Sequence, residues 1–417
     1  KLVGGMSYGA VGPAPLRTRV HPNIVVPYTG GSNLRQSNPI EGMQRGLDGW
    51  FKAGLRNFYW RPNLMYFDYF GLPFYYAEDG GRIVQYMVRN GAKGFDFDTW
   101  GNHFATDGVN VFVILRIMWD PEQDVEALVR EYCDNAYGRC GGLAHQYLMR
   151  CKAIREEIKK AQGLPRRDQD WVGTLGRFFD EQAIQDLDRL AEQMQAASRQ
   201  DADQFRRRVE VFLKGHAYTR LQAAVIRLND KKNKTVEEYN RLISLVAEKE
   251  QFIENLGPTW AVCAPVIRWR TRFNKFGPSV GFLFYESLKG KRVSAALPER
   301  WAFYVDQSDS GEQKKLHTEE FDDSHLVTIS IYDTWEPQGF DYNGIAWYRA
   351  RFRAPRREPG KRYCLWLGAV DESCWIYLNG RKVGENIYDA EKNPDAWYTP
   401  TWADVTDHLR YDDENLV

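Results

Sequence analysis

Short apolar runs alternate with amphipathic stretches over the first 120 residues of the chain. The runs KLVGGMSYGA, NIVVPYT, NFYW and AKGFDFDTW have the length and apolar content of buried strands. Two stretches between them, EGMQRGLDGWFKAG and AEDGGRIVQYMVRNG, have helical periodicity and end near a Gly that suits a helix C-cap. Strands that alternate with helices predict a parallel sheet with covered faces. The second half of an eight-stranded barrel and an open doubly wound sheet both fit this pattern, and periodicity does not separate them.

Residues 121–260 have the apolar periodicity of helices. A long helix is predicted to begin with Asp120 as its N-cap and Pro121 in its first turn. Further helices are predicted at about 179–197, 202–229 and 235–256, each with an apolar stripe at helical spacing. This pattern predicts a helical region or bundle with a structural role.

The pattern changes to short strands after a linker at 261–295. Residues 296–417 contain the runs WAFYVD, LVTISI, IAWYRARF, RYCLWLGAV and CWIYLNGRKVGEN. The pair Asn379-Gly380 between apolar runs predicts a type I′ hairpin. Several short strands with turn signals predict a β-sandwich or jelly roll. The fold class is therefore multidomain, α/β followed by all-β.

Both ends of the sequence lead us to expect a piece of a longer protein. The chain opens at Lys1 directly into a strand-like run, and YDDENLV stops at what resembles the start of another strand. We therefore expect a C-terminally truncated β domain and any targeting signal upstream.

Composition excludes several classes of partner. Lys plus Arg and Asp plus Glu both total 56, so the basic surplus of a nucleic-acid binder is absent. No apolar run reaches the roughly 20 residues of a spanning helix, and no membrane partner is predicted. The sequence has no CxxC, HExxH or GxGxxG motif, so neither metal nor cofactor is predicted.

Cys364 and Cys374 lie on neighbouring predicted strands and are either a disulfide or two buried thiols. Nothing predicts the oligomeric state.

The last third of the chain resembles a known module. WEPQGFDYNGIAWYRARFRAP and YCLWLGAVDESCWIYLNGRKVGEN resemble the sugar-binding-type, galactose-binding-like jelly roll of family 2 glycoside hydrolases, with Asn343-Gly344 where Asp-Gly is common. In multidomain glycosidases such modules often serve as packing struts, and we favour that role over sugar binding here. Family 2 enzymes place this module before their barrel, whereas here it follows, which argues against a family 2 enzyme.

The first part resembles a different family. SYGAVGPAP, HPNIVVPYT, NGAKGF and LRIMWDPEQDVEALVREYCDNAYG are similar to the C-terminal half of the DUF4838 barrel family, which corresponds to glycoside hydrolase family 163. The resemblance covers roughly residues 1–160. It implies half of a (β/α)8 TIM-type barrel over 1–120 and endo-β-N-acetylglucosaminidase activity on N-glycans, with the substrate's acetamide as nucleophile.

That resemblance also says where the catalytic acids belong. The family's acidic pair is expected near the fourth barrel strand, which would precede Lys1, so the chain alone is expected to be inactive. A secreted, periplasmic or cell-surface location is expected for the whole enzyme. The alternatives are a β-galactosidase, β-glucuronidase or α-glucuronidase-like enzyme, and a non-catalytic carbohydrate-binding or scaffold protein.

Barrel geometry places substrate-binding candidates at the C-terminal ends of strands. Trp100 is the candidate for stacking under a sugar ring, with a core or rim position as the alternative. Tyr8 is a hydrogen-bond candidate or a buried Tyr, and Trp60 lines the pocket or packs. Tyr28 also ends a strand.

Three polar residues complete the candidate set. Asp96 and Asp98 alternate along a strand, so both side chains point the same way. Two carboxylates that close would repel and share a proton. Hydroxyl binding by one or both is the candidate role, and direct acid catalysis is the lesser alternative. His103 lies in the predicted loop GNHFATDG, where it contacts substrate or is solvated.

Overall fold

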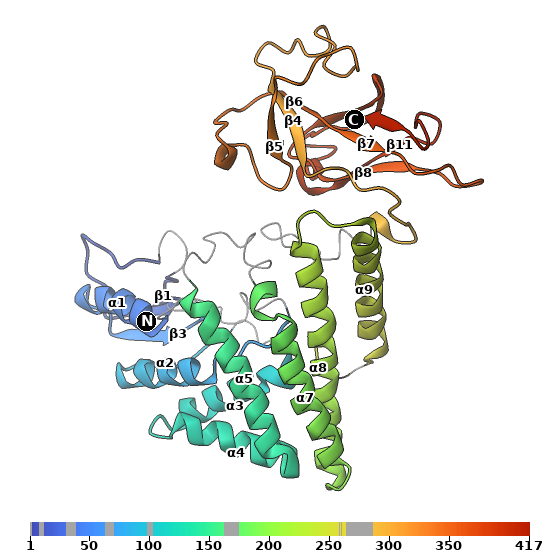
Figure 1. Cartoon of the computed structure of the whole chain (residues 1–417). Coiled ribbons are helices and arrows are strands. Elements are labelled where there is room, and N and C mark those ends of the chain that lie inside the picture. Colours follow the sequence, from blue (N-terminus) through green and yellow to red (C-terminus); the bar gives the residue numbers. More distant parts are fainter. Residues whose placement is uncertain are drawn as a thin grey trace. The chain divides into compact units, whose positions relative to one another are not determined.

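The computed structural model describes residues 2–7, 12–30, 39–62, 71–97, 103–161, 175–257, 259, 261–263 and 287–417. The chain divides into two compact units, one of residues 1–227 and 248–280 and the other of residues 228–247 and 281–417. The first contains a parallel sheet and most of the helices, and the second contains an antiparallel β domain (Figure 1).

The parallel sheet of the first unit has its strands in sequential order, β1-β2-β3. These are β1 (Val3–Gly4), β2 (Ile24–Tyr28) and β3 (Asn57–Trp60). Single bridges extend the parallel pairing from Ser7 to Tyr28 and from Trp60 to Phe95. The predicted parallel pairing is confirmed. The strands are shorter than the apolar runs, and the described residues do not form a closed barrel.

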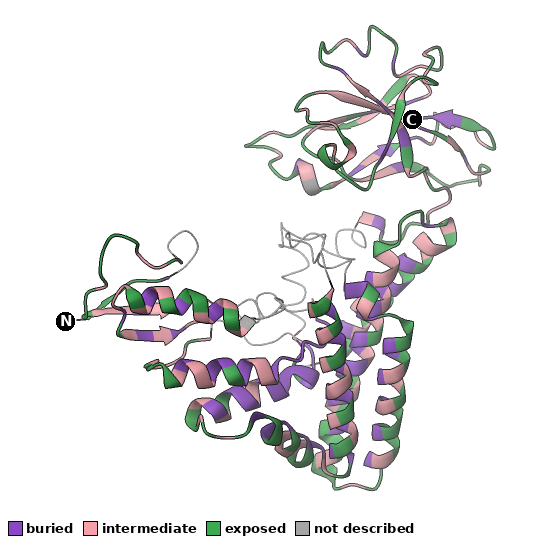
Figure 2. Cartoon of the chain, turned by 60° about the vertical axis from the view of Figure 1, so that its left-hand side comes forward, coloured by how far each residue is buried: buried purple, intermediate pink, exposed green. Residues whose placement is uncertain are grey.

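The helices follow the predicted stripes closely. They are α1 (Pro39–Lys52), α2 (Ala77–Arg89), α3 (Phe104–Trp119), α4 (Val125–Tyr137), the short 3-10 helix η2 (Gly138–Cys140), α5 (Gly141–Lys160), α7 (Glu181–Ser198), α8 (Asp203–Asp230) and α9 (Val236–Asn255). The helices predicted at about 179–197, 202–229 and 235–256 are confirmed as α7, α8 and α9 within two residues. Buried residues gather on the helix faces that point toward one another (Figure 2). Among the described residues, no helix has both the length and the apolar character needed to cross a membrane.

The predicted helix start at Asp120 is wrong. Asp120 follows α3 with extended backbone, and its carboxylate accepts a hydrogen bond from the Glu122 backbone N–H at 3.1 Å. The next helix begins at Val125, where the Asp124 carboxylate caps it by accepting from the Ala127 N–H at 2.7 Å. Both Asp residues have capping chemistry, and the one directly before the apolar stripe caps the helix.

Helix α3 was not predicted from the sequence. Its buried residues lie all around its first three turns, from Ala105 to Val113, so no polar face marks it as amphipathic. Such a helix is stable only when surrounded by other elements, and α2 and α4 both pack against it.

The β domain is antiparallel throughout. Its strands are β4 (Arg300–Val305), β5 (Val327–Ser330), β6 (Ala346–Arg349), β7 (Arg351–Arg353), β8 (Cys364–Ala369), β9 (Cys374–Leu378), β10 (Arg381–Asn386), β11 (Pro400–Asp404) and β12 (Glu414–Leu416), with 3-10 turns at Glu336–Gln338 and Ala396–Tyr398. They pair as β5-β4-β6, β12-β7, β11-β8 and β10-β9. A shared core joins several of these pairs through Leu365, Ile376, Leu378, Ala403 and Val405.

Two sequence predictions concern this domain, the type I′ hairpin and the relation of Cys364 to Cys374. The type I′ hairpin is supported, because Asn379 and Gly380 both have positive φ, 50° and 84°. The neighbouring position of Cys364 and Cys374 is wrong, because β8 pairs with β11 and β9 pairs with β10. Both thiols are free, which confirms the alternative to a disulfide, but Cys364 is exposed and Cys374 is half-buried, so the predicted burial is wrong.

We predict that an Ala at position 384 destabilises the β domain. A Cβ on Gly384 would lie 2.9 Å from the Cβ of Ala403 on β11, so one strand must shift. Gly384→Ala should lower the free energy of unfolding by about 1–3 kcal/mol in urea denaturation.

Gly368→Ala on β8 is the matched control, since a Cβ there meets nothing within 4 Å. Its expected change is within about 0.5 kcal/mol. Equal stability of the two variants would contradict the close approach of β10 to β11.

Candidate functional site

The carboxyl edge of the parallel sheet brings several polar groups together. Parallel strands end at the same edge, and ligands of α/β folds bind there. Beyond β2 lie Thr29 and Gly30, beyond β3 lies Arg61, and Asp96 follows the bridge at Phe95. A backbone hydrogen bond holds the ends of β2 and β3 in register, because the Arg61 N–H donates to the Tyr28 carbonyl at 2.9 Å.

An ion pair between Arg61 and Asp96 is the main polar feature of this edge. The Arg61 Nε lies 3.3 Å from Asp96 Oδ2, and the two side chains are 25% and 53% exposed. Asp96 is placed by its own N–H, which donates to the Trp60 carbonyl at 2.9 Å. The pair presents donors and acceptors side by side, as recognition of neighbouring sugar hydroxyls requires. Within the described residues, no cluster of three His, Cys, Asp or Glu side chains is arranged to hold a metal ion.

Arg61 was missed by the sequence analysis. It directly follows the apolar run NFYW, so its position at a strand end was the signal that marked it. The residue types expected to bind sugar at this edge are aromatic and acidic, whereas Arg61 contributes a guanidinium that pairs with Asp96.

Two aromatic candidates are buried beneath the edge. The Trp60 ring is fully buried between Phe95 and Phe97, at centroid distances of 6.4 and 6.0 Å, and its Nε1 donates to the Gly30 carbonyl at 3.1 Å. The Tyr28 hydroxyl donates to the Met43 carbonyl at 3.4 Å. Burial, with smaller contributions from nearby acidic groups, raises the pKa of Tyr28 to about 12. Both side chains pack here, and substrate contact by Trp60 stays a prediction.

Tyr8, Asp98 and Trp100 lie outside the described residues. Their predicted roles in hydrogen bonding, hydroxyl binding and stacking stay predictions. Asp98 and Trp100 follow Asp96 in the chain by two and four residues.

His103 is a core residue, and the prediction of a solvated loop is wrong. It is fully buried at the N-cap position of α3. Its Nε2 lies 2.9 Å from the Gly215 carbonyl and 3.0 Å from the Thr219 hydroxyl, both on α8. Its Nδ1 lies 2.8 Å from the Thr106 hydroxyl. Both nitrogens are therefore satisfied internally, and its predicted contact with substrate stays untested.

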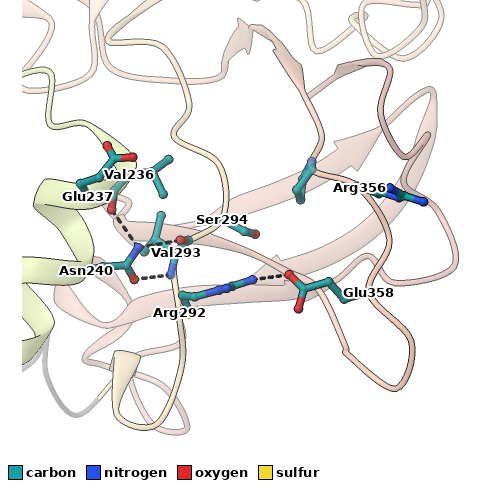
Figure 3. Close-up of a pocket in the computed structure, with 9 residues that line it drawn as sticks. Val236, Glu237, Asn240, Arg292, Val293, Ser294, Arg356 and Glu358 are labelled. Carbon is teal, nitrogen blue, oxygen red and sulfur yellow. Dashed lines mark hydrogen bonds and ion pairs between the residues drawn. The ribbon is translucent and has the colours of Figure 1, made fainter.

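A pocket lies within the second unit (Figure 3). It has a volume of about 680 Å³ and is lined by the start of α9, the segment before β4 and the loop after β7. Asn240 on α9 accepts from the Val293 N–H at 3.0 Å and donates to its carbonyl at 2.8 Å. Arg292 pairs with Glu358 across the wall. The polar groups of the pocket wall hydrogen-bond or pair with one another. Because they are already satisfied in this way, we assign the wall a structural role.

Comparison with known protein families gives a match within the first unit. A family model described as a domain of unknown function, DUF4838, matches residues 1–149.

Curated relatives share shorter segments. A beta-galactosidase from Thermoanaerobacter pseudethanolicus is 30% identical over 105 residues, 24% of this chain and 13% of that protein. A beta-glucuronidase from Formosa agariphila is 28% identical over 76 residues, 18% of this chain and 7% of that protein. The matched segments thus span about an eighth or less of each relative.

Among solved structures, a b-glucuronidase from Ruminococcus gnavus in complex with a C6-substituted uronic isofagomine is 17% identical. The match covers 29% of this chain and 20% of that one, with a TM-score of 0.25. The same enzyme in complex with D-glucuronic acid is 18% identical, with 29% and 20% covered and a TM-score of 0.24.

We predict that the free energy of unfolding falls at acidic pH and that His103 causes part of this fall. Burial lowers the pKa of His103 to about 4, below the value of about 6.5 in an unfolded chain. The unfolded state therefore binds the imidazole proton more readily than the folded state does. The contribution of His103 to the free energy of unfolding is complete above pH 6.5 and is lost as the pH falls toward 4. The expected loss at pH 4 is about 3 kcal/mol.

Urea denaturation of the wild type and of His103→Gln between pH 7 and pH 4 measures this contribution. The variant should be less stable at pH 7 and lose stability less steeply on acidification. Burial also lowers the pKa of His216 and His145, and their contributions remain in both proteins. An unchanged slope in the variant would contradict the prediction.

Proposed function

We propose that this chain belongs to a glycoside hydrolase in which residues 1–120 form the C-terminal half of a (β/α)8 barrel. Sequential parallel strands support this proposal, since a doubly wound sheet reverses its strand order at a switch point. The match of residues 1–149 to DUF4838 supports it independently. Residues 296–417 are then an accessory jelly-roll module.

The observation that carries the proposed function is the Arg61–Asp96 pair at the carboxyl edge of this sheet. In a barrel this edge surrounds the substrate. A half-exposed carboxylate and a guanidinium at that position suit the recognition of sugar hydroxyls. The beta-galactosidase and beta-glucuronidase relatives support glycosidic bonds as the target.

The finer proposal is an endo-β-N-acetylglucosaminidase acting on N-glycans. It follows from the resemblance to glycoside hydrolase family 163, in which the substrate's acetamide attacks the anomeric carbon. The general acid that protonates the leaving oxygen then belongs to a strand preceding β1, in a longer, secreted or periplasmic protein. A β-galactosidase, β-glucuronidase or α-glucuronidase-like activity is the alternative within the same class.

A non-catalytic carbohydrate-binding protein is the second candidate. The observation that favours it is the pairing of Asp96 with Arg61, an arrangement that suits hydroxyl binding and supplies no proton to a leaving group.

Glycan release distinguishes these functions. The 417-residue chain and the full-length product of its gene are incubated with a glycoprotein that carries high-mannose N-glycans, and released glycans are measured by mass spectrometry. The proposal expects release by the full-length protein alone, with one N-acetylglucosamine left on the asparagine. Release by the 417-residue chain would overturn the upstream position of the acid. Hydrolysis of an aryl β-galactoside or β-glucuronide without glycan release would establish the alternative substrate.

We predict that Asp96→Asn weakens substrate binding in the full-length enzyme. Loss of a charge-assisted hydrogen bond of about 1.5–3 kcal/mol corresponds to a fall in kcat/KM of about 10- to 100-fold, carried mainly by KM.

Glu122→Gln is the matched control, because Glu122 forms an exposed ion pair with Arg89 at 3.6 Å in the last turn of α2. Its kinetic constants should equal those of the wild type. A KM for Asp96→Asn that equals the control would remove Asp96 from the substrate site.

A further inference from the structure

Two buried histidines hold helix α8 in the first unit. His216 lies on α8 itself, and His103 lies at the start of α3. Among the described residues, these are the two histidines that are buried, and both belong to the first unit. Because imidazole is the side chain that titrates near neutral pH, buried histidines make a fold responsive to acid.

His103 connects α3 to α8. Its Nε2 lies 2.9 Å from the Gly215 carbonyl, which only accepts, so this nitrogen carries the hydrogen. Its Nδ1 lies 2.8 Å from the Thr106 hydroxyl and is therefore the acceptor of the neutral ring. A Cβ at position 215 would lie 2.8 Å from Cε1 of His103. The imidazole thus binds α8 at a close approach of the two helices.

His216 connects α8 to α5 and α7. Its Nδ1 lies 3.0 Å from the Tyr147 hydroxyl on α5, and its Nε2 lies 2.8 Å from Asp188 Oδ1 on α7. A carboxylate only accepts, so Nε2 carries the hydrogen and Nδ1 accepts from the tyrosine in the neutral ring. His216 directly follows Gly215, so the bonds from α8 to three other helices meet within two residues.

A proton on either imidazole changes these bonds. It replaces the one acceptor of the neutral ring by a second donor. Nδ1 of His216 would then face the hydroxyl hydrogen of Tyr147, and Nδ1 of His103 would face that of Thr106, so each hydroxyl must turn away. Both rings are buried, and a charge without access to water is costly. The folded unit therefore favours two neutral rings.

The charges around His216 oppose one another. Burial lowers the pKa of His216, and Arg220 adds to this effect, whereas Asp188 and Glu192 act in the opposite direction. Arg220 also pairs with Asp188 at 3.2 Å, which partly neutralises that carboxylate. The ionisable groups that face His216 are Tyr147 on α5, Asp188 and Glu192 on α7, and Arg220 on α8.

The surroundings of His103 disfavour a charge more strongly. Burial lowers the pKa of His103 to about 4, against the opposing effect of the Gly215 carbonyl, and a charge on His216 lowers it further. A charge on either ring thus makes a charge on the other less favourable. The ionisable groups that face His103 are Asp107, which the Thr106 hydroxyl contacts at 3.1 Å, Tyr218 at a ring distance of 6.0 Å, and His216.

We propose that His103 and His216 form a latch that holds α8 against α3, α5 and α7 at neutral pH and releases it at acidic pH. Once α8 is released, both rings are exposed and take up protons at about pH 6.5, so release binds protons and acid favours it. The latch is closed above about pH 6.5 and opens as the pH falls toward 4. The described residues of the β domain include no buried histidine, so that domain should keep its structure. This inference does not rest on the proposed function.

Hydrogen exchange, measured by mass spectrometry on the whole 417-residue chain at pH 7 and pH 4, tests the proposal. Exchange times are scaled for the effect of pH on the chemical exchange rate, so that the protection of each segment can be compared. The amide protection of α8 should fall at least about tenfold at pH 4, whereas that of β8 and β9 should stay within about twofold. Protection of α8 should return when the sample is brought back to pH 7.

Two variants separate the latch from simple packing. His216→Gln removes one protonation site, so the loss of α8 protection between pH 7 and pH 4 should be several-fold smaller. Asp188→Asn keeps an acceptor for Nε2 of His216 but removes a negative charge that favours the charged ring. The loss should therefore exceed that of the wild type. A residue that only packs would change protection equally at both pH values.

His325→Gln is the matched control, because His325 is exposed in the β domain. It should show the wild-type loss, and circular dichroism at pH 7 confirms that each variant is folded. If His216→Gln does not fold, Asp188→Asn decides, since it keeps the hydrogen bond. Full protection of α8 at pH 4, an equal loss in β8 and β9, a loss that does not recover, or a loss in Asp188→Asn equal to that of the control would overturn the proposal.

Discussion

The buried imidazole of His103 imposes the constraint on which the packing of the first unit depends. Its two nitrogens are satisfied by groups on α8 and by Thr106, and an unsatisfied buried polar atom would cost about 1–3 kcal/mol. The start of α3 must therefore stay against α8 at hydrogen-bonding distance. Residue 215 has to be Gly for this approach, because a Cβ there would overlap the Cβ of Ala105.

Polar side chains of α3 extend this constraint toward the parallel sheet. Asp107 accepts from the Phe74 N–H at 3.0 Å, and Asn110 accepts from the Tyr76 N–H at 2.9 Å and donates to the Phe74 carbonyl at 2.8 Å. These bonds satisfy backbone groups of Phe74 and Tyr76 in the segment before α2, which lies outside the named strands and helices. Helix α3 thus fixes the residues that lead directly into α2.

The sheet edge and the β domain present different side-chain chemistry. The sheet edge presents the Arg61–Asp96 pair, and its neighbouring aromatic residue, Trp60, is buried. The β domain presents exposed rings, with Trp375 the most exposed of them. Polar groups at defined positions fix the orientation of a ligand, whereas exposed rings contribute apolar contact area.

Local patterns in the sequence determined most of the elements, because an amphipathic stripe or an alternating strand is visible within a dozen residues. They predicted α7, α8 and α9, the parallel pairing and the position of Asp96 at a strand end. Only the tertiary structure decided that α3 is a helix, that Cys364 and Cys374 lie apart, and that His103 is buried. Some partners of a buried polar group come from distant parts of the chain, as the separation of 112 positions from His103 to Gly215 shows, and no local pattern contains that information.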